Sequence, residues 1–231
     1  MSAPSGGIDI RLPDGSVRSV PNGTTAGEVL QAWRPKEARE FLAARFDDAL
    51  VDLSQPLRHA GALTPLTFRD REGRDVLQHS SAHVVAKAVT EVVPGALPTA
   101  GPPTEDGFHY DFDVRPLTPD DQAKIEAAIA ATIKAGEKFE RIEVSREEAN
   151  RLCAANPHKL GYIREIPEGE TVSLYRTGSF LDLCRGPHVP DTHWLRGLHL
   201  LGISAVSADG TAAGPSRQRI RGVGFPTREE L

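Results

Sequence analysis

The fold class that the sequence predicts is α+β, and three observations lead to it. Residues Ile8–Val20 contain two short alternating runs around a Pro-Asp-Gly-Ser turn, which is typical of a hairpin. Thr25–Glu28 and Ser145–Glu148 have the capping-box pattern that begins a helix. Phe108–Val114 alternates strictly between apolar and polar residues, which predicts a half-buried strand. Helices and strands are therefore expected in both the early and the late parts of the chain.

The first elements predict a small domain over residues 8–72, after a flexible tail at residues 1–7. Its capped helix runs from Thr25 to Trp33, and Pro35 ends or bends it. The other elements expected here are a helical piece over Ala38–Arg45 and strands over Ala49–Leu53 and Leu66–Phe68.

The second domain is predicted to cover residues 73–231. Asp75–Gln78 can act as an Asp variant of a capping box for the helix that follows. Thr118 begins another helix, and Gly136 can cap its end. Further elements are expected as strands over Phe139–Val144, Thr171–Tyr175, Ser179–Leu183 and Leu198–Val206, and as a helix from Ser145 to Asn156-Pro157.

The composition limits the classes of function. The chain has 231 residues, 39% hydrophobic and 26% charged, with no apolar run of membrane-spanning length, so no membrane association is expected. Two cysteines fit a reducing cytoplasm, and the absence of a Gly-rich phosphate loop predicts no nucleotide cofactor. The net charge of −5 means that a nucleic-acid partner needs a local basic patch. Arg217, Arg219 and Arg221 are candidates for phosphate contacts, the alternative being a solvated face.

Two short motifs carry metal-ligand chemistry. His79 and His83 are spaced to lie on one face of a helix, and Cys184 and His188 are spaced alike in a loop after a strand. A His/His/Cys/His set suits zinc. One pair alone is more typical of a polar edge on a packed helix. Two pairs together favour a shared polar site, metal-bound or not. Ser80 stands where a metalloprotease would have its Glu, so that class is excluded.

The order of the N-terminal pieces, with LPDGS, the GTTAGEVL helix start and the returning strands, resembles a TGS domain. This small ubiquitin-like module opens threonyl-tRNA synthetases. Another β-grasp unit is the alternative interpretation.

The second region resembles the editing domain of threonyl-tRNA synthetase. The motifs that carry the resemblance are HSSAH, GPP-x-x-x-GF-x-YDFD, NPHKL, LDLCRGPHVPDT and RQRIRGVGFP, in that order. Two departures are visible. The chain stops at Leu231, where a synthetase continues into further domains, and Val206–Gly210 replaces an AYWRG-like run. Both lead us to expect a freestanding domain that edits in trans.

The resemblance implies hydrolysis of the ester that joins a wrong amino acid to the 3′ adenosine of tRNA. It implies that the site contains His79, His83, Cys184 and His188, together with Tyr110, Lys159 and Asp182. Lys159 could stabilise the oxyanion or position water, and Asp182 could bind the substrate ammonium group. An ordinary exposed lysine after a Pro loop is the alternative for Lys159.

Metal binding stays open at this stage. Four ligands on zinc would form a closed structural site, whereas catalysis by a zinc-bound water needs one open position. Related alanyl editing proteins bind zinc. Without metal, the resemblance implies that His83 and Lys159 position water, helped by the terminal ribose hydroxyl.

The expected function is a trans-acting aminoacyl-tRNA deacylase acting on mischarged tRNA(Thr) and sparing Thr-tRNA. The load is seryl or a threonine analogue such as 4-fluorothreonyl. The altered Val206–Gly210 run fits a retuned domain, as in the freestanding fluorothreonyl-tRNA deacylases, which this chain resembles. Two alternatives remain. One is a non-catalytic tRNA- or ribosome-binding module with a structural zinc; the other is a hydrolase or transferase acting on a non-tRNA amino-acid ester.

Overall fold

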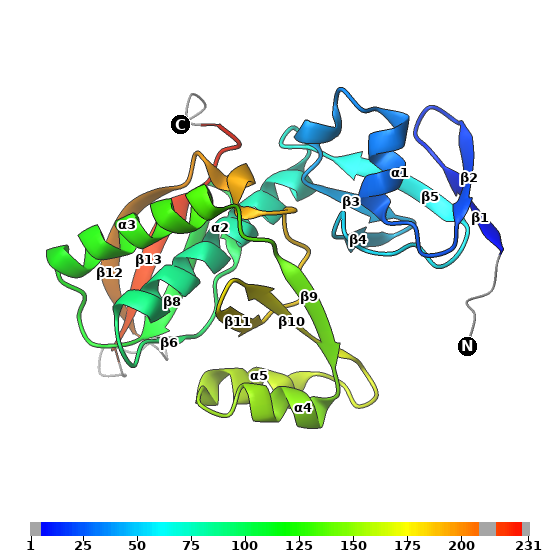
Figure 1. Ribbon diagram of the computed structural model, residues 1–231. Coiled ribbons are helices and arrows are strands. Elements are labelled where there is room, and N and C mark those ends of the chain that lie inside the picture. The colour runs from blue at the N-terminus through cyan, green and yellow to red at the C-terminus, as the bar shows by residue number, and fades with distance from the viewer. Residues whose placement is uncertain (1–5, 208–215, 228–231) are drawn as a thin grey trace. The chain divides into compact units, whose positions relative to one another are not determined.

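The computed structural model describes residues 6–207 and 216–227 (Figure 1). It divides into two compact units, one of Met1–Leu77 with Gly186–Pro190, the other of Gln78–Arg185 with Asp191–Leu231. Each unit combines strands and helices, so the predicted α+β class is confirmed for the described residues. In these ranges no helix is long and apolar enough to cross a membrane.

The described residues of the first unit form a five-stranded sheet and the helix α1, followed by the beginning of the long helix α2 (Arg71–Val92). The strand order is β2-β1-β5-β3-β4, in which β1 and β5 are parallel and the other neighbours are antiparallel. The elements are β1 (Gly7–Arg11), β2 (Val17–Pro21), α1 (Ala26–Trp33), the 3₁₀ helix η1 (Ala38–Glu40), β3 (Ala43–Phe46), β4 (Ala49–Val51) and β5 (Gly61–Leu66).

Sequence signals account for most of this unit. Ile8 and Ile10 alternate into the core, as the hairpin pattern predicts, and Val29 and Leu30 of α1 pack in the same core. The capping box at Thr25 forms: its side chain accepts from the Glu28 backbone N–H, and the Glu28 carboxylate accepts from the Thr25 N–H.

The predicted helical piece over Ala38–Arg45 is wrong after its first turn. Only Ala38–Glu40 is helical, and Ala43–Phe46 forms β3 between β4 and β5. Pairing with a strand on each side outweighs the helical preference of Ala43 and Ala44.

The second unit contains two sheets. One has the order β12-β13-β8-β6, with β7 also paired to β8, and the other has the order β11-β10-β9. The first sheet is built from β6 (Leu97–Pro98), β7 (Pro103–Thr104), β8 (Gly107–Asp113), β12 (His199–Ser207) and β13 (Ser216–Val223). The second is built from β9 (Glu140–Val144), β10 (Val172–Thr177) and β11 (Phe180–Leu183). The helices are α2 (Arg71–Val92), α3 (Pro119–Ala135), α4 (Arg146–Leu152), α5 (Pro157–Glu165) and the 3₁₀ helix η2 (Thr192–Leu195).

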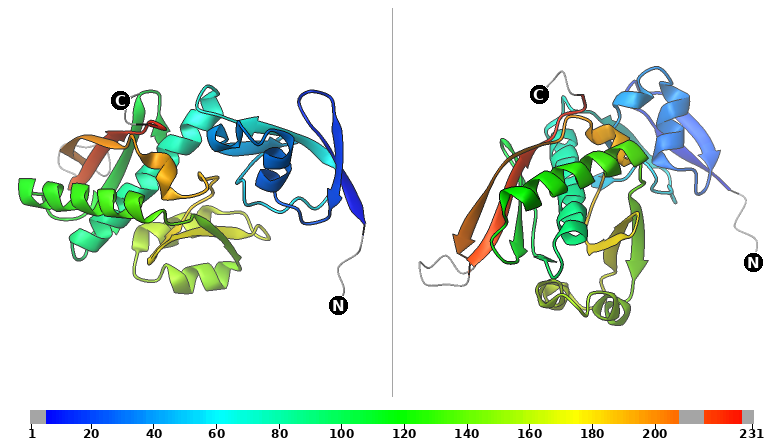
Figure 2. Two further views of the ribbon diagram at one scale, coloured as in Figure 1. Left: turned by 45° about the horizontal axis from the view of Figure 1, so that its top comes forward. Right: turned by 60° about the vertical axis from the view of Figure 1, so that its left-hand side comes forward.

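Each sheet of this unit has its own helical cover. Figure 1 and Figure 2 show α2 and α3 on the same side of the β12-β13-β8 sheet. Phe108, Tyr110 and Phe112 alternate into the buried side of β8, as the strict alternation predicts. Below the smaller sheet, α4 and α5 form a separate core in which Ile163 packs with Leu174.

The helix that carries the histidines begins earlier than predicted. It starts at Arg71, so Asp75 lies inside α2 rather than at its N-cap. The carboxylate of Asp70 instead accepts hydrogen bonds from the backbone N–H and the hydroxyl of Thr67 (2.8 and 2.9 Å). This Thr-x-x-Asp turn is the helix start signal, and it lies about one turn before the start predicted at Asp75.

Two predictions fall partly outside the described residues. Residues 1–5 of the expected tail lie outside the described residues, and Gly7, the last residue of that tail, belongs to β1. In the Val206–Gly210 run, positions 208–210 also lie outside. Val206 and Ser207 belong to β12 and pair with Arg217 and Ser216.

Candidate active site

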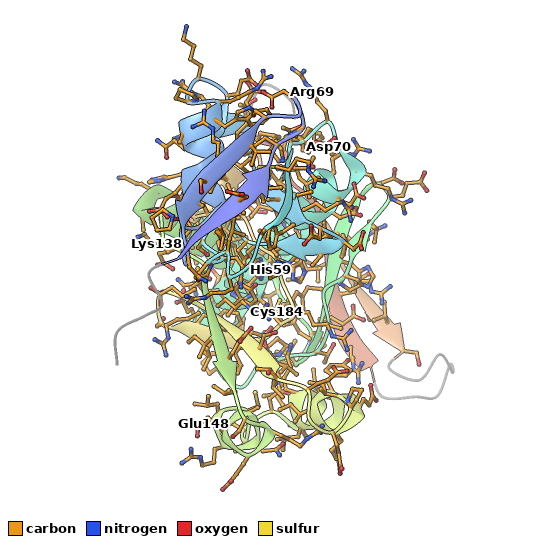
Figure 3. All side chains as sticks on the ribbon, turned by 90° about the vertical axis from the view of Figure 1, so that its right-hand side faces the viewer. His59, Arg69, Asp70, Lys138, Glu148 and Cys184 are labelled. Atoms are coloured by element: carbon orange, nitrogen blue, oxygen red, sulfur yellow. The ribbon has the colours of Figure 1, made fainter. Side chains whose placement is uncertain are left out.

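Helix α2 presents two imidazoles toward the strand β11 and its following residue. The Nε2 atom of His79 lies 2.9 Å from Sγ of Cys184, which comes directly after β11 and is labelled in Figure 3. One helical turn later, the ring of His83 lies edge-on between Phe139 and Phe180, at centroid distances of 5.5 and 5.0 Å. The helical spacing predicted from the sequence therefore places both rings on one side of α2.

Both imidazoles are neutral at physiological pH. Burial lowers the pKa of His79 to about 4, although a hydrogen bond with the backbone of Gly101 opposes the shift. Burial also lowers the pKa of His83 to about 3. A neutral imidazole keeps one nitrogen lone pair, so each ring can accept a proton or bind a metal ion.

Beside them lies a buried polar cluster formed by Tyr110, Lys159 and Asp182. The ammonium group of Lys159 contacts the two carboxylate oxygens of Asp182 at 2.9 and 3.0 Å. The Tyr110 hydroxyl donates to Asp182 at 2.9 Å and accepts from Lys159 at 3.3 Å. All three residues are at most 6% exposed, so two opposite charges and a phenol are held together away from water.

Helix α5 explains why Lys159 is buried here rather than exposed. Asn156 is its N-cap, accepting from the backbone N–H groups of His158 and Lys159, and Pro157 occupies the first helical position. The sequence pattern predicts Asn156-Pro157 as the end of the previous helix, whereas in the structure it begins α5. The signal was present, because Asn followed by Pro is also a favoured helix start. The helix turns Lys159 inward, so the exposed-lysine alternative does not hold.

The other two members of the cluster come from strands. Tyr110 lies on the buried face of β8, and burial followed by the Asp182 carboxylate raises its pKa well above the usual range. Asp182 lies in β11 opposite Tyr175 of β10. Gly101 fits against the Tyr110 ring so closely that a Cβ at this position would lie 2.1 Å from a ring carbon. Glycine is therefore required where the Gly-Pro-Pro motif passes the site.

Three of the four residues expected to bind metal form a compact donor group. The ligand atoms of His79, Cys184 and His188 lie within 4.8 Å of one another, and His83 is not a member of this group. Two imidazole nitrogens and one sulfur are the chemistry that zinc prefers, and three protein ligands would leave one coordination position open. The donor set fits an open zinc site better than the closed four-ligand site.

The three arginines near the C-terminus lie on one face of β13, because they alternate along the strand. Arg219 forms a bidentate ion pair with Asp111 of β8, at 2.7 and 2.8 Å. Arg221 is exposed and stands opposite His109, while Arg217 is partly exposed opposite Val206. The guanidinium of Arg219 is therefore already engaged within the sheet.

Comparison with known proteins shows similarity to threonine–tRNA ligases over nearly the whole chain. Residues 172–221 match the family described as Threonyl and Alanyl tRNA synthetase second additional domain. The chain is 43% identical to the threonine–tRNA ligase of Symbiobacterium thermophilum over 97% of this chain and 35% of that protein. It is 40% identical to the enzyme of Carboxydothermus hydrogenoformans (97% and 36%) and 41% identical to that of Laribacter hongkongensis (96% and 36%). The chain thus spans about a third of the length of the curated relatives it matches.

Proposed function

We propose that this chain is a deacylase that hydrolyses the ester bond of mischarged tRNA(Thr). The observation that carries the proposal is the buried Tyr110–Lys159–Asp182 cluster beside the neutral His79 and His83. The similarity of nearly the whole chain to threonine–tRNA ligases, and the family match over β10 to β13, support tRNA as the partner. Action in trans, as a protein separate from a synthetase, is part of the proposal.

The chemistry requires an oriented water, stabilisation of the developing oxyanion and a group that holds the amino acid. The Asp182 carboxylate can receive the substrate ammonium group, because it already binds the ammonium of Lys159. Displaced from that pair, Lys159 becomes available to stabilise negative charge on the carbonyl oxygen. A neutral His83 can accept a proton from the attacking water. That proton passes to the ribose oxygen as the bond between this oxygen and the carbonyl carbon breaks, so the free amino acid and the tRNA hydroxyl are released.

Zinc is compatible with this proposal. His79, Cys184 and His188 would hold the ion, and a bound zinc would polarise a carbonyl oxygen or lower the pKa of a water molecule. The proton-accepting role of His83 and the ammonium-binding role of Asp182 do not depend on it.

The N-terminal region over residues 8–72 is proposed to be a TGS-like β-grasp domain, with residues 73–231 forming the editing domain. The parallel pair β1 and β5 at the centre of a mixed sheet with one helix supports this proposal. The two motifs quoted for the resemblance, the Pro-Asp-Gly-Ser turn and the Thr25 helix start, occupy the β1–β2 turn and the start of α1.

The substrate load is proposed to be serine or a threonine analogue such as 4-fluorothreonine. A synthetase pocket discriminates poorly against one small group, since a methylene is worth only about 1–3 kcal/mol. Either amino acid would therefore reach tRNA(Thr) and need removal.

A deacylation assay tests the proposal. The chain is added as a separate protein to tRNA(Thr) carrying labelled serine, 4-fluorothreonine or threonine, and release of the amino acid is followed over time. Release of serine or fluorothreonine with threonine spared is expected. If Thr-tRNA is cleaved as fast as both others, editing is excluded, because such an enzyme would drain the pool it should protect. Binding of all three without release would favour the non-catalytic tRNA-binding module.

A further inference from the structure

Tyr162 is an exposed aromatic residue on the helix that supplies the site lysine. It is 37% exposed, and it is the one aromatic residue among the exposed large hydrophobic side chains of the described residues. Apart from its chain neighbours and the backbone of its own helix, the neighbouring Gly161 has no atom within 4 Å of the place that a Cβ would occupy, so the space beside it is open. The Tyr162 ring is therefore partly accessible to a ligand, and it is not a member of the apolar core formed by α4, α5 and β10.

The helix register places Tyr162 at the edge of the polar cluster. Lys159 and Ile163 are buried, and Tyr162 follows Lys159 by three residues, so the two side chains are neighbours on the surface of α5. The phenol of Tyr162 is also among the groups that raise the pKa of Tyr110, whose hydroxyl contacts Asp182. Tyr162 therefore lies within electrostatic range of the buried cluster while its ring remains accessible.

The proposed substrate brings a second planar group close to this ring. The ester is attached to the ribose of the terminal nucleoside, so its base must lie about one sugar away from the carbonyl that is attacked. Exposed aromatic side chains are common platforms for unpaired bases in RNA-binding proteins. We propose that Tyr162 stacks on the base of the terminal nucleoside and so positions the ester next to Lys159 and Asp182. This inference rests on the proposed function. The stacking contact involves the base alone and not the ester or the attacking water.

Binding of a non-hydrolysable analogue measures the contact directly. The probe is 3′-deoxy-3′-(seryl)amino-adenosine, in which an amide replaces the ester. Tyr162→Ala is expected to weaken its binding roughly 5- to 150-fold, the range for loss of one base–aromatic stack. Tyr162→Phe keeps the ring and should bind like the wild type. Leu152→Ala, which removes another exposed apolar side chain of the α4–α5 pair, is the matched control and should have no effect.

A second probe separates stacking from a general disturbance of α5. It is the same seryl-amino ribose without a base, for which wild type and Tyr162→Ala should bind equally. An equal loss with both probes, or no loss with either, would overturn the inference. In turnover, Tyr162→Ala should raise KM with little change in kcat, because stacking is present in both ground and transition states.

The outcomes for the inference and for the proposed function differ. A wild type that hydrolyses mischarged tRNA while Tyr162→Ala behaves identically refutes only the stacking contact. A wild type that binds the adenosine probe through Tyr162 but releases no amino acid refutes only the hydrolysis. A wild type that neither binds the probe nor hydrolyses the ester refutes both.

Discussion

Lys159 and Asp182 carry opposite charges in a part of the molecule where both side chains are at most 7% exposed. Removing one partner of a buried ion pair leaves an uncompensated charge and typically costs about 3–5 kcal/mol. We therefore expect Lys159→Met to lower the free energy of unfolding by about that amount, even though Tyr110 still donates to Asp182. Urea denaturation of the wild type and the variant measures this change in the free energy of unfolding.

The double variant Lys159→Met/Asp182→Leu is the control for this cost. Because it removes both charges, it should recover much of the lost stability while remaining unable to bind a substrate ammonium group. If the double variant is less stable than either single variant, the cost comes from packing and not from the unpaired charge.

The two cysteines offer a matched pair of substitutions at the site. Cys184 contacts His79, whereas Cys153 packs in the apolar core formed by α4, α5 and β10. Cys184→Ala should lower the deacylation rate by at least about 100-fold, in line with the loss of a site group. Cys153→Ala should keep the rate and lower the melting temperature slightly. Equal rates for both variants would remove Cys184 from the site.

At the scale of elements, the start of α3 depends on one carboxylate. Asp121 accepts from the backbone N–H and the hydroxyl of Thr118 and forms a bidentate pair with Arg115. These hydrogen bonds, the one from Arg115 first, hold the pKa of the Asp121 carboxyl well below its ordinary value of 3.8. Because the pKa is lower in the folded chain, the stabilisation is fully present above that ordinary value. It is lost as the pH falls below it.

The measurement compares melting temperatures of the wild type and Asp121→Asn across pH. The wild type should melt higher at pH 7, and the difference should shrink as the pH falls below 3.8. Asp120→Asn removes the same charge from an exposed neighbour and should change little. A difference that stays constant down to pH 2 would show that the ionised carboxylate is not the source.

Local signals predicted the elements whose structure is decided locally. The Thr118 cap, the αL glycine at Gly136 and the alternation of β8 are confirmed because each is fixed by neighbouring residues. The predictions failed where distant pairing decides, as in β3, or where one signal has two meanings, as at Asn156-Pro157. A proline after asparagine can follow one helix or begin the next, and only the packing of α5 distinguishes them.

The convergence of the site is a property of the whole molecule. Side chains from α2, β8, α5, β11 and the residue after β11 meet, although some of them are more than a hundred residues apart in the chain. Spacing and periodicity describe which face a residue occupies but not which faces meet. The expectation that Tyr110, Lys159 and Asp182 share one site came from the family motifs. Residue spacing and periodicity do not predict it. The stacking role inferred for Tyr162 needed the helix α5, which the sequence interpretation did not contain.

Binding of a polyanion by a chain of net charge −5 requires positive charge to be concentrated locally. The face of β13 provides such a concentration, but its three arginines are not equivalent. Arg219 is paired with Asp111, whereas Arg217 and Arg221 lie on the same face and are at least partly exposed. We therefore expect the phosphate contacts to come mainly from Arg217 and Arg221.

The salt dependence of tRNA binding tests this expectation. Each phosphate contact contributes about 0.7–0.9 to the slope of log K against log salt concentration, so Arg217→Ala/Arg221→Ala should flatten the slope by about 1.4–1.8. Adding Arg219→Ala should flatten it further by less than one contact, because that guanidinium neutralises Asp111 first. Arg11→Ala/Arg39→Ala removes the same charge from exposed positions of the first unit and separates a local effect from net charge. If the slope changes equally in both double variants, the β13 arginines make no specific phosphate contacts and form an ordinary solvated face.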